Sequence, residues 1–106
     1  MKPARVRPAA IADRLNGASY YRDVAGSAVA ERFLTSTRAA LERLEANPAI
    51  GSPAHGISLD IPGLRSWPAD DFQVLWFYFE REDHPDIIRL LGERQDIATI
   101  LAGPDQ

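Results

Sequence analysis

A segment rich in proline and glycine, residues 47–63, divides this sequence into two halves of different character. Its prolines and glycines are Pro48, Gly51, Pro53, Gly56, Pro62 and Gly63. Such a density predicts a turn-rich crossing loop without a regular element of its own. Before the loop, apolar residues recur at helical spacing, whereas after it they form short contiguous runs. A chain ordered in this way is expected to fold as α+β, with helices packed on one face of a small sheet.

Two amphipathic helices are predicted before the loop. The first covers residues 9–22, and its apolar positions at spacings of three and four are Ile11, Leu15, Ala18 and Tyr21. Gly17 interrupts this helix and costs about 1 kcal/mol relative to alanine. The second should have Ser27 as its N-cap and end before Asn47, and its apolar face is formed by Val29, Phe33, Thr37, Leu41 and Leu44. The short link between them predicts an antiparallel helical hairpin.

Strands are predicted at the start of the chain and after the loop. Residues 4–8 alternate around Val6 as a short strand would, and should pair at the sheet edge or beside the long strand 72–79. Apolar runs over residues 64–67, 72–79 and 86–91 have hairpin-sized links, which predicts an antiparallel meander. A helical turn over residues 97–101 would close a single domain spanning residues 1–106. The predicted order is strand, helix, helix and three strands, in a mainly antiparallel sheet.

The run over residues 72–79 is apolar on both of its faces. Alternation sends Phe72, Val74, Trp76 and Tyr78 to one face, and Gln73, Leu75, Phe77 and Phe79 to the other. One of these faces must pack against the helices. The other is too apolar for bare solvent, and two interpretations stay open. Either this face binds a partner, or the strand is central in the sheet and covered on both sides.

The charges are distributed unevenly along the chain. The net charge is −3, yet residues 1–43 carry eight basic and only four acidic side chains. This basic half either faces an acidic partner or forms solvated helix faces, and a net acidic chain is poorly suited to binding nucleic acid through phosphates. The absence of cysteine excludes a disulfide scaffold and a thiolate metal site, and suits the cytoplasm. We expect no cofactor, no metal and no membrane-spanning segment.

Short motifs follow one another in a fixed order along residues 4–101. They are Ala10-x-x-Asp13 with Tyr20-Tyr21, Ala30-x-x-Phe33, Leu41-x-x-Leu44-x-x-Asn47-Pro48-x-x-Gly51, Pro62-Gly63-Leu64-Arg65, Phe72–Trp76, Ile88–Leu91 and Glu93–Ile97. In this order and spacing they resemble the ParE branch of the RelE/ParE superfamily, the small toxins of bacterial type II toxin–antitoxin modules. The resemblance implies a β-α-α-β-β-β fold.

The resemblance also implies a function and partners. ParE-like toxins are associated with inhibition of DNA gyrase, and a small antitoxin encoded beside the toxin, here a ParD-like protein, keeps them inactive. Such an antitoxin would lay a helix on residues 29–44 and an extended tail along the sheet. RelE-like relatives on the same fold are instead ribosome-dependent mRNA endonucleases, and a degenerate toxin would only bind its antitoxin.

Three positions bear on the choice between gyrase inhibition and RNA cleavage. The nuclease branch typically uses strand arginines and a C-terminal tyrosine, because cleavage needs proton transfer and positive charge beside the phosphorane. The strand position holds Gln73 here and the tyrosine position holds Ile100, so that Arg94 alone remains to supply charge. These residues favour a toxin that acts by protein binding and has no catalytic residues.

Ten residues are predicted to contact the target or the antitoxin. They are Phe33, Leu41, Arg65, Trp67, Phe72, Trp76, Tyr78, Arg89, Arg94 and Asp96. Arg65 and Arg89 lie on predicted strands, where each either contacts a partner or pairs with an acid of the same chain. Asp96 is the acid expected for Arg65 in the second case.

Overall fold

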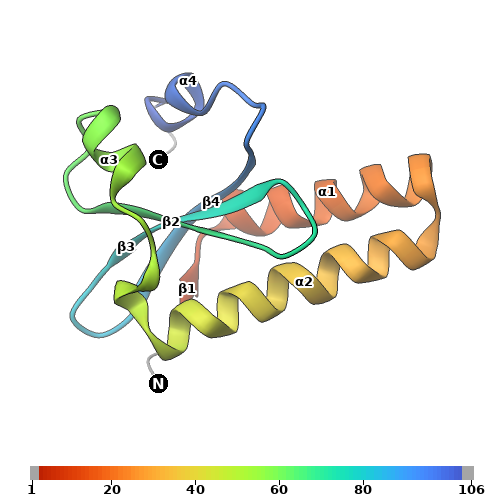
Figure 1. Ribbon diagram of the computed structural model, residues 1–106, viewed down its shortest axis with the longest axis horizontal. Helices are drawn as coiled ribbons and strands as arrows, with labels where there is room; N and C mark the ends of the chain where they lie inside the picture. The colour runs from red at the N-terminus through yellow and green to blue at the C-terminus, as the bar shows by residue number, and fades with distance from the viewer. Residues whose placement is uncertain (1–2, 104–106) are drawn as a thin grey trace.

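The computed structural model describes residues 3–103 and forms a four-stranded sheet with helices on both faces (Figure 1). Along the chain the elements are β1 (Arg5–Val6), α1 (Pro8–Ala25), α2 (Ser27–Ala46), the 3₁₀ helix η1 (Pro48–Ile50), α3 (Ala54–Ser58), β2 (Leu64–Pro68), β3 (Val74–Glu80), β4 (Pro85–Gly92) and α4 (Ile97–Leu101). The predicted α+β class, with one strand, two long helices and three strands in that order, is confirmed. Over the described residues no helix combines the length and the apolar character needed to cross a membrane.

The sheet has the strand order β1-β4-β3-β2. β3 pairs antiparallel with both β2 and β4, which confirms the predicted meander. β1 lies at the sheet edge beside β4 rather than beside β3, and it runs parallel to β4 with Val6 opposite Ile87. Only two residues of β1 pair, because Pro8 begins α1 immediately afterwards.

An ion pair fixes the start of the chain to β4. Arg7 Nη2 lies 2.7 Å from Asp86 Oδ2, and Arg7 Nε donates to Asp86 Oδ1 at 3.0 Å. The bond from the guanidinium of Arg7 holds the pKa of the Asp86 carboxyl below its usual value. This pair therefore joins the residue before α1 to β4, two segments that are far apart in the sequence.

Two hydrophobic cores lie on opposite faces of the sheet, as the alternation in residues 72–79 predicts. Trp76 and Tyr78 pack with Phe33 beneath the α1–α2 hairpin. Leu75 and Phe77 belong to the second core, whose other buried members are Leu64, Ile88, Leu91 and Leu101. α3 packs against β2, and Leu101 brings α4 into the same core. The long strand is therefore central and covered on both sides, and the interpretation of an open partner face is wrong.

The crossing loop contains two short helices, which corrects the prediction of a loop without elements. Pro48 stands at the start of η1, where its fixed φ suits a first helical turn. Gly56 lies inside α3, and a Cβ at this position would come within 2.7 Å of the Leu64 carbonyl. The proline and glycine that indicated turns thus permit tight helical turns against the sheet.

The link between α1 and α2 is a single residue. Gly26 has a φ of 96° and occupies the cap position of both helices, a conformation that glycine adopts without steric cost. Ser27 is consequently the first residue of α2 and not its predicted N-cap. α1 also continues to Ala25, three residues beyond the predicted end at residue 22.

Gly17 is a point of close contact between the two long helices. A Cβ on Gly17 would lie 2.6 Å from Cζ of Phe33, whose ring also packs against the rings of Tyr21 and Phe72. Replacing Gly17 with alanine gains about 1 kcal/mol of helix propensity, but overpacking a filled core costs about 1–3 kcal/mol. We therefore expect Gly17→Ala to lower the free energy of unfolding, measured by urea denaturation.

Asn16→Ala is the matched control for this prediction. Asn16 precedes Gly17 on α1 and is exposed, so alanine there improves helix propensity without a clash. The control should be neutral or slightly stabilising. If Gly17→Ala stabilises the protein as much as Asn16→Ala does, the contact with Phe33 is not tight.

Candidate functional site

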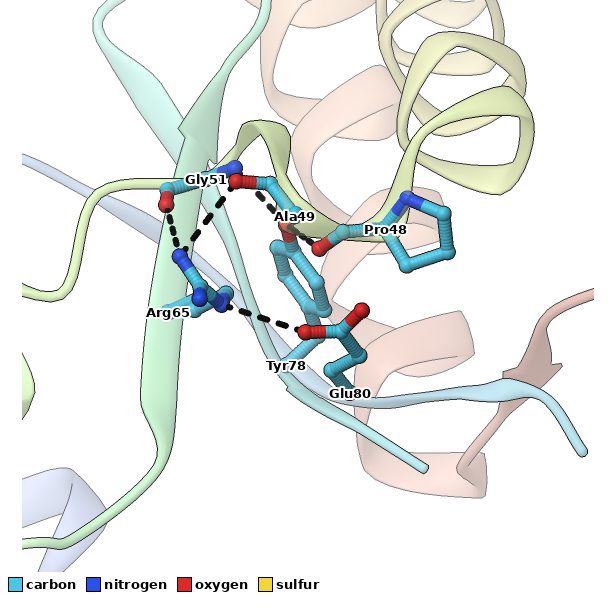
Figure 2. A network of polar contacts seen from close by, with 6 residues as sticks. All are labelled: Pro48, Ala49, Gly51, Arg65, Tyr78 and Glu80. Atoms are coloured by element: carbon cyan, nitrogen blue, oxygen red, sulfur yellow. Dashed lines mark hydrogen bonds and ion pairs between the residues drawn. The ribbon is translucent and has the colours of Figure 1, made fainter. Parts of the chain in front are cut away.

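Two of the candidate residues, Arg65 and Tyr78, hold the segment that follows α2 in place (Figure 2). The buried hydroxyl of Tyr78 donates to the Pro48 carbonyl at 2.7 Å and accepts from the Gly51 amide at 2.9 Å. From the neighbouring strand, Arg65 Nη1 donates to the Gly51 carbonyl at 2.7 Å, and Arg65 Nε lies 3.7 Å from Oε1 of Glu80. Burial raises the pKa of Tyr78, so that its hydroxyl stays protonated and can donate.

Arg65 thus pairs with an acid of its own chain, but this acid is Glu80 and not Asp96. The predicted pairing with Asp96 is wrong because Asp96 caps α4. Its carboxylate accepts from the Thr99 hydroxyl at 2.7 Å and from the Thr99 amide at 3.2 Å. These bonds, the one from the hydroxyl first, lower the pKa of Asp96. An aspartate directly before a short helix is a common N-cap, and this signal is present in the sequence.

Arg89 is bound to α1 through Asp13. Its Nε and Nη2 donate to the two carboxylate oxygens of Asp13 at 2.7 and 2.8 Å, a bidentate pair. The same carboxylate also accepts from the backbone amide of Leu90 at 3.0 Å. Of the two interpretations for Arg89, the structure bears out the pairing with an internal acid. The Asp13 carboxylate therefore also binds the backbone amide of Leu90 on β4, which a further strand could otherwise use for pairing.

The aromatic candidates pack inside the protein. Phe33 and Trp76 are each 1% exposed, and the indole nitrogen of Trp76 donates to a backbone carbonyl of α2 at 2.9 Å. Phe72 is half-buried, with its ring edge-on to Phe33. Trp67 is half-buried on β2, and the guanidinium of Arg43 lies 5.3 Å from its ring centroid. Most of these side chains therefore contribute first to the fold.

Arg94 is a candidate that stays exposed. It lines a cleft of about 610 Å³ between the C-terminal half of α1 and the adjoining ends of β3 and β4. Tyr20, which is 60% exposed, lines the same cleft together with Gln95. Among residues 3–103, Arg94 takes part in no hydrogen bond or ion pair, so its charge is open to a binding partner.

A second cleft, of about 200 Å³, lies between α1 and α2, on the hairpin where the resemblance implies an antitoxin helix along residues 29–44. Two candidates, Leu41 and Trp76, line it. Ile11 and Leu15 of α1 also line it, with exposed fractions of 47% and 57%. Its charged lining residues are two arginines, Arg14 and Arg38.

The exposure of Ile11 and Leu15 has a cause that the sequence contains. The apolar stripe of the first helix was predicted at spacings of three and four, but α1 turns smaller residues toward the core. Ala10 is fully buried, and Gly17 admits the ring of Phe33. Because these small residues let α1 approach α2 and the sheet closely, the larger side chains on the flanking face remain outside.

The structure is thus a small α+β protein whose two long helices expose a surface that is both apolar and basic. Surfaces of this kind are common in proteins that bind other proteins. A family model described as the ParE toxin of the type II toxin–antitoxin system, parDE, matches residues 4–97. The chain therefore belongs to the ParE toxin family, which confirms the resemblance found in its motifs. Membership in a toxin–antitoxin family implies an antitoxin partner.

The fold agrees with this assignment. The chain is similar to a solved structure described as the chromosomal ParDE TA system from P. aeruginosa, with a TM-score of 0.73 and 18% sequence identity. The similarity covers 87% of this chain and 96% of that chain. At this identity the likeness establishes the fold alone. No curated protein matches the chain.

Proposed function

We propose that this protein is a ParE-type toxin that inhibits DNA gyrase by binding it, and that a small ParD-like antitoxin encoded beside it neutralises it. The family match over residues 4–97 carries this proposal. Gyrase acts in the cytoplasm, so the protein would act there too. The basic and apolar surface of the α1–α2 hairpin is consistent with a function in protein binding.

The arginines on the strands favour gyrase inhibition over RNA cleavage. Arg65 is paired with Glu80, and Arg89 forms a bidentate pair with Asp13. A phosphate would have to compete with a carboxylate for each of these guanidinium groups. Ile100, at the position where the nuclease branch has a tyrosine, packs against the second hydrophobic core. These contacts support a toxin without a ribonuclease site.

The test is to induce this chain alone in a bacterial host and to follow the incorporation of labelled thymidine and labelled methionine. We expect DNA synthesis to stop first while translation continues, because gyrase supports replication. The purified chain should inhibit supercoiling by purified DNA gyrase. Co-expression of the protein encoded by the adjacent gene should abolish both effects, which provides the control.

Two other results would support the other candidate functions. A collapse of methionine incorporation within minutes would indicate an endonuclease, and Arg94→Ala should then abolish RNA cleavage in an extract that contains ribosomes. No change in either label, together with tight binding to the adjacent gene product, would indicate a degenerate toxin that only binds its antitoxin.

A further inference from the structure

The cleft between α1 and α2 contains two positive charges that no carboxylate of residues 3–103 pairs with. Arg14 donates through Nε to the Thr37 hydroxyl at 2.9 Å and through Nη2 to the Leu34 carbonyl at 2.8 Å, and both acceptors are neutral. Arg38 lies one turn beyond Leu34 on α2, is exposed, and takes part in no hydrogen bond or ion pair with the residues described. The cleft is therefore a site of unbalanced positive charge.

The guanidinium group of Arg14 is held in a fixed orientation and still has unused donors. An arginine carries five N–H donors in a rigid plane. The bonds to Thr37 and Leu34 use two of them, so three have no acceptor in the described part of the chain. Because α2 already orders this side chain, a ligand that binds it loses little affinity to side-chain ordering.

The two unpaired charges have an electrostatic cost. Burial and, secondarily, the positive charge of Arg38 lower the pKa of the Arg14 guanidinium. Buried charges in proteins are normally paired, and two like charges that face one cleft repel each other. An anion placed between the two arginines would relieve both effects, because guanidinium groups bind anionic oxygens with strong, charge-assisted hydrogen bonds.

The acidic residues close to the two arginines along the helices do not neutralise them. Asp13 forms the bidentate pair with Arg89 on β4. Glu45 accepts a hydrogen bond from a backbone amide just before β1. Glu42 lies one turn beyond Arg38 and is exposed, but the two form no ion pair. The negative charge that fits this cleft must therefore come from a ligand.

The walls of the cleft are apolar, which specifies the rest of the ligand. The apolar lining residues come from both helices and from the sheet, and they are Val6, Ile11, Leu15, Leu41 and Trp76. The volume of about 200 Å³ equals that of about seven water molecules, which suits a chain of about six to eight carbon atoms. It lies below the roughly 300–1,000 Å³ of sites for drug-sized ligands, so the ligand is small. An inorganic ion would leave these apolar walls in contact with water.

We propose that the cleft between α1 and α2 binds a small amphipathic monocarboxylate, with its carboxylate between Arg14 and Arg38 and its apolar chain against Ile11, Leu15 and Leu41. The carboxylate accepts hydrogen bonds from both guanidinium groups, and the chain covers the apolar walls. This inference does not rest on the proposed function, because neither gyrase nor an antitoxin is needed for it.

The experiment follows nitrogen–proton correlation NMR spectra of the full-length chain during titration with sodium octanoate. We expect saturable shifts at the backbone amides of Leu15 and Arg38 and at the indole N–H of Trp76, with a Kd of about 1 mM or lower. The indole reports on this site because it donates to the Thr37 carbonyl, while the Thr37 hydroxyl accepts from Arg14.

Two matched compounds test the two parts of the ligand separately. Octanol keeps the chain but lacks the charge, whereas acetate keeps the carboxylate but lacks the chain. Each should bind at least about tenfold more weakly than octanoate, because a buried methylene contributes about fourfold to affinity and a hydrogen bond to a charged group about tenfold or more. If octanol or acetate binds as tightly as octanoate, the cleft does not recognise an amphipathic carboxylate and the inference is wrong.

Arg38→Gln should weaken octanoate binding about tenfold, because it removes one of the two positive charges. Arg38 has no partner within the described chain, so this variant should fold normally, which the spectrum of the free variant checks. Arg32→Gln, the same change at an exposed position on another face of α2, is the control and should stay within about threefold of wild type.

The apolar wall has its own pair of variants. Leu15→Ala should weaken octanoate binding about threefold or more, because it removes apolar surface that the chain contacts. Val24→Ala, also exposed on α1 but outside the lining of the cleft, should leave binding unchanged. The inference is overturned if octanoate causes no saturable shift at the cleft, or if Arg38→Gln binds it as tightly as wild type does.

Discussion

Replacing Asp13 with alanine should lower the free energy of unfolding by about 3–4 kcal/mol, because it removes the bidentate carboxylate that binds a mostly buried guanidinium group. Asp13 accepts two hydrogen bonds from Arg89 and one from the Leu90 amide, all within 3.0 Å. Arg89 and Asp13 are only 19% and 14% exposed, so solvent compensates little for the loss. Urea denaturation followed by tryptophan fluorescence measures the effect.

Asp23→Ala is the control for this prediction, since it removes a carboxylate from the same helix. Oδ1 of Asp23 lies 3.9 Å from Nε of Arg22, and both side chains are largely exposed. An exposed pair of this kind contributes about 0–1 kcal/mol, so the control should change stability little. Equal losses for the two variants would contradict a structural role for the pair formed by Asp13 and Arg89.

Tyr78→Phe should cost about 2–3 kcal/mol, because it leaves two hydrogen-bonding groups of the backbone without their partner. The lost hydroxyl bridges the Pro48 carbonyl and the Gly51 amide. We expect the loss to be concentrated in residues 48–51, where amide exchange at Gly51 should accelerate more than the global change in stability explains.

Tyr20→Phe is the control, because it removes a phenolic hydroxyl from an exposed tyrosine. It should leave the free energy of unfolding almost unchanged. If Tyr78→Phe is also neutral, water replaces the hydroxyl without cost. If Gly51 exchanges as slowly as in wild type, the hydroxyl does not hold this segment.

Much of the fold was predictable because it depends on local patterns. The helical spacing before residue 47 and the apolar runs after residue 63 gave the correct elements in the correct order. The alternation in residues 72–79 also assigned Trp76 and Leu75 to opposite cores. These patterns suffice because the period of an element reports which of its faces is buried.

The predictions from sequence were wrong where tertiary contacts determine the local structure. The glycine and proline of residues 48–56 indicated turns, yet close packing against Leu64 requires a glycine inside α3. The pairing of Arg65 with Glu80 depends on the register between β2 and β3, which no local pattern specifies.

The α1 side of the cleft between α1 and α2 was missed for a related reason. The predicted apolar stripe of the first helix is right for Ala18 and Tyr21, which pack against the core, but Ala10 and Gly17 face the core where Ile11 and Leu15 were expected to. Ile11 and Leu15 are exposed because Ala10 is the residue of this turn that α1 buries against the core. Which residue is buried depends on how α1 packs against the rest of the protein, and the pattern within the helix does not specify it.

The parallel pairing of β1 with β4 has a consequence for the synthesis of the protein. Two carboxylate–arginine pairs hold this region of the sheet, Asp13 with Arg89 and Arg7 with Asp86, and they join residues 76 and 79 positions apart in the sequence. Contacts of such sequence separation form late, because a long stretch of chain must first be ordered. A ribosome that has not yet translated β4 therefore holds a helical hairpin without its sheet edge. The complete sheet therefore forms only after β4, Pro85–Gly92, has been translated.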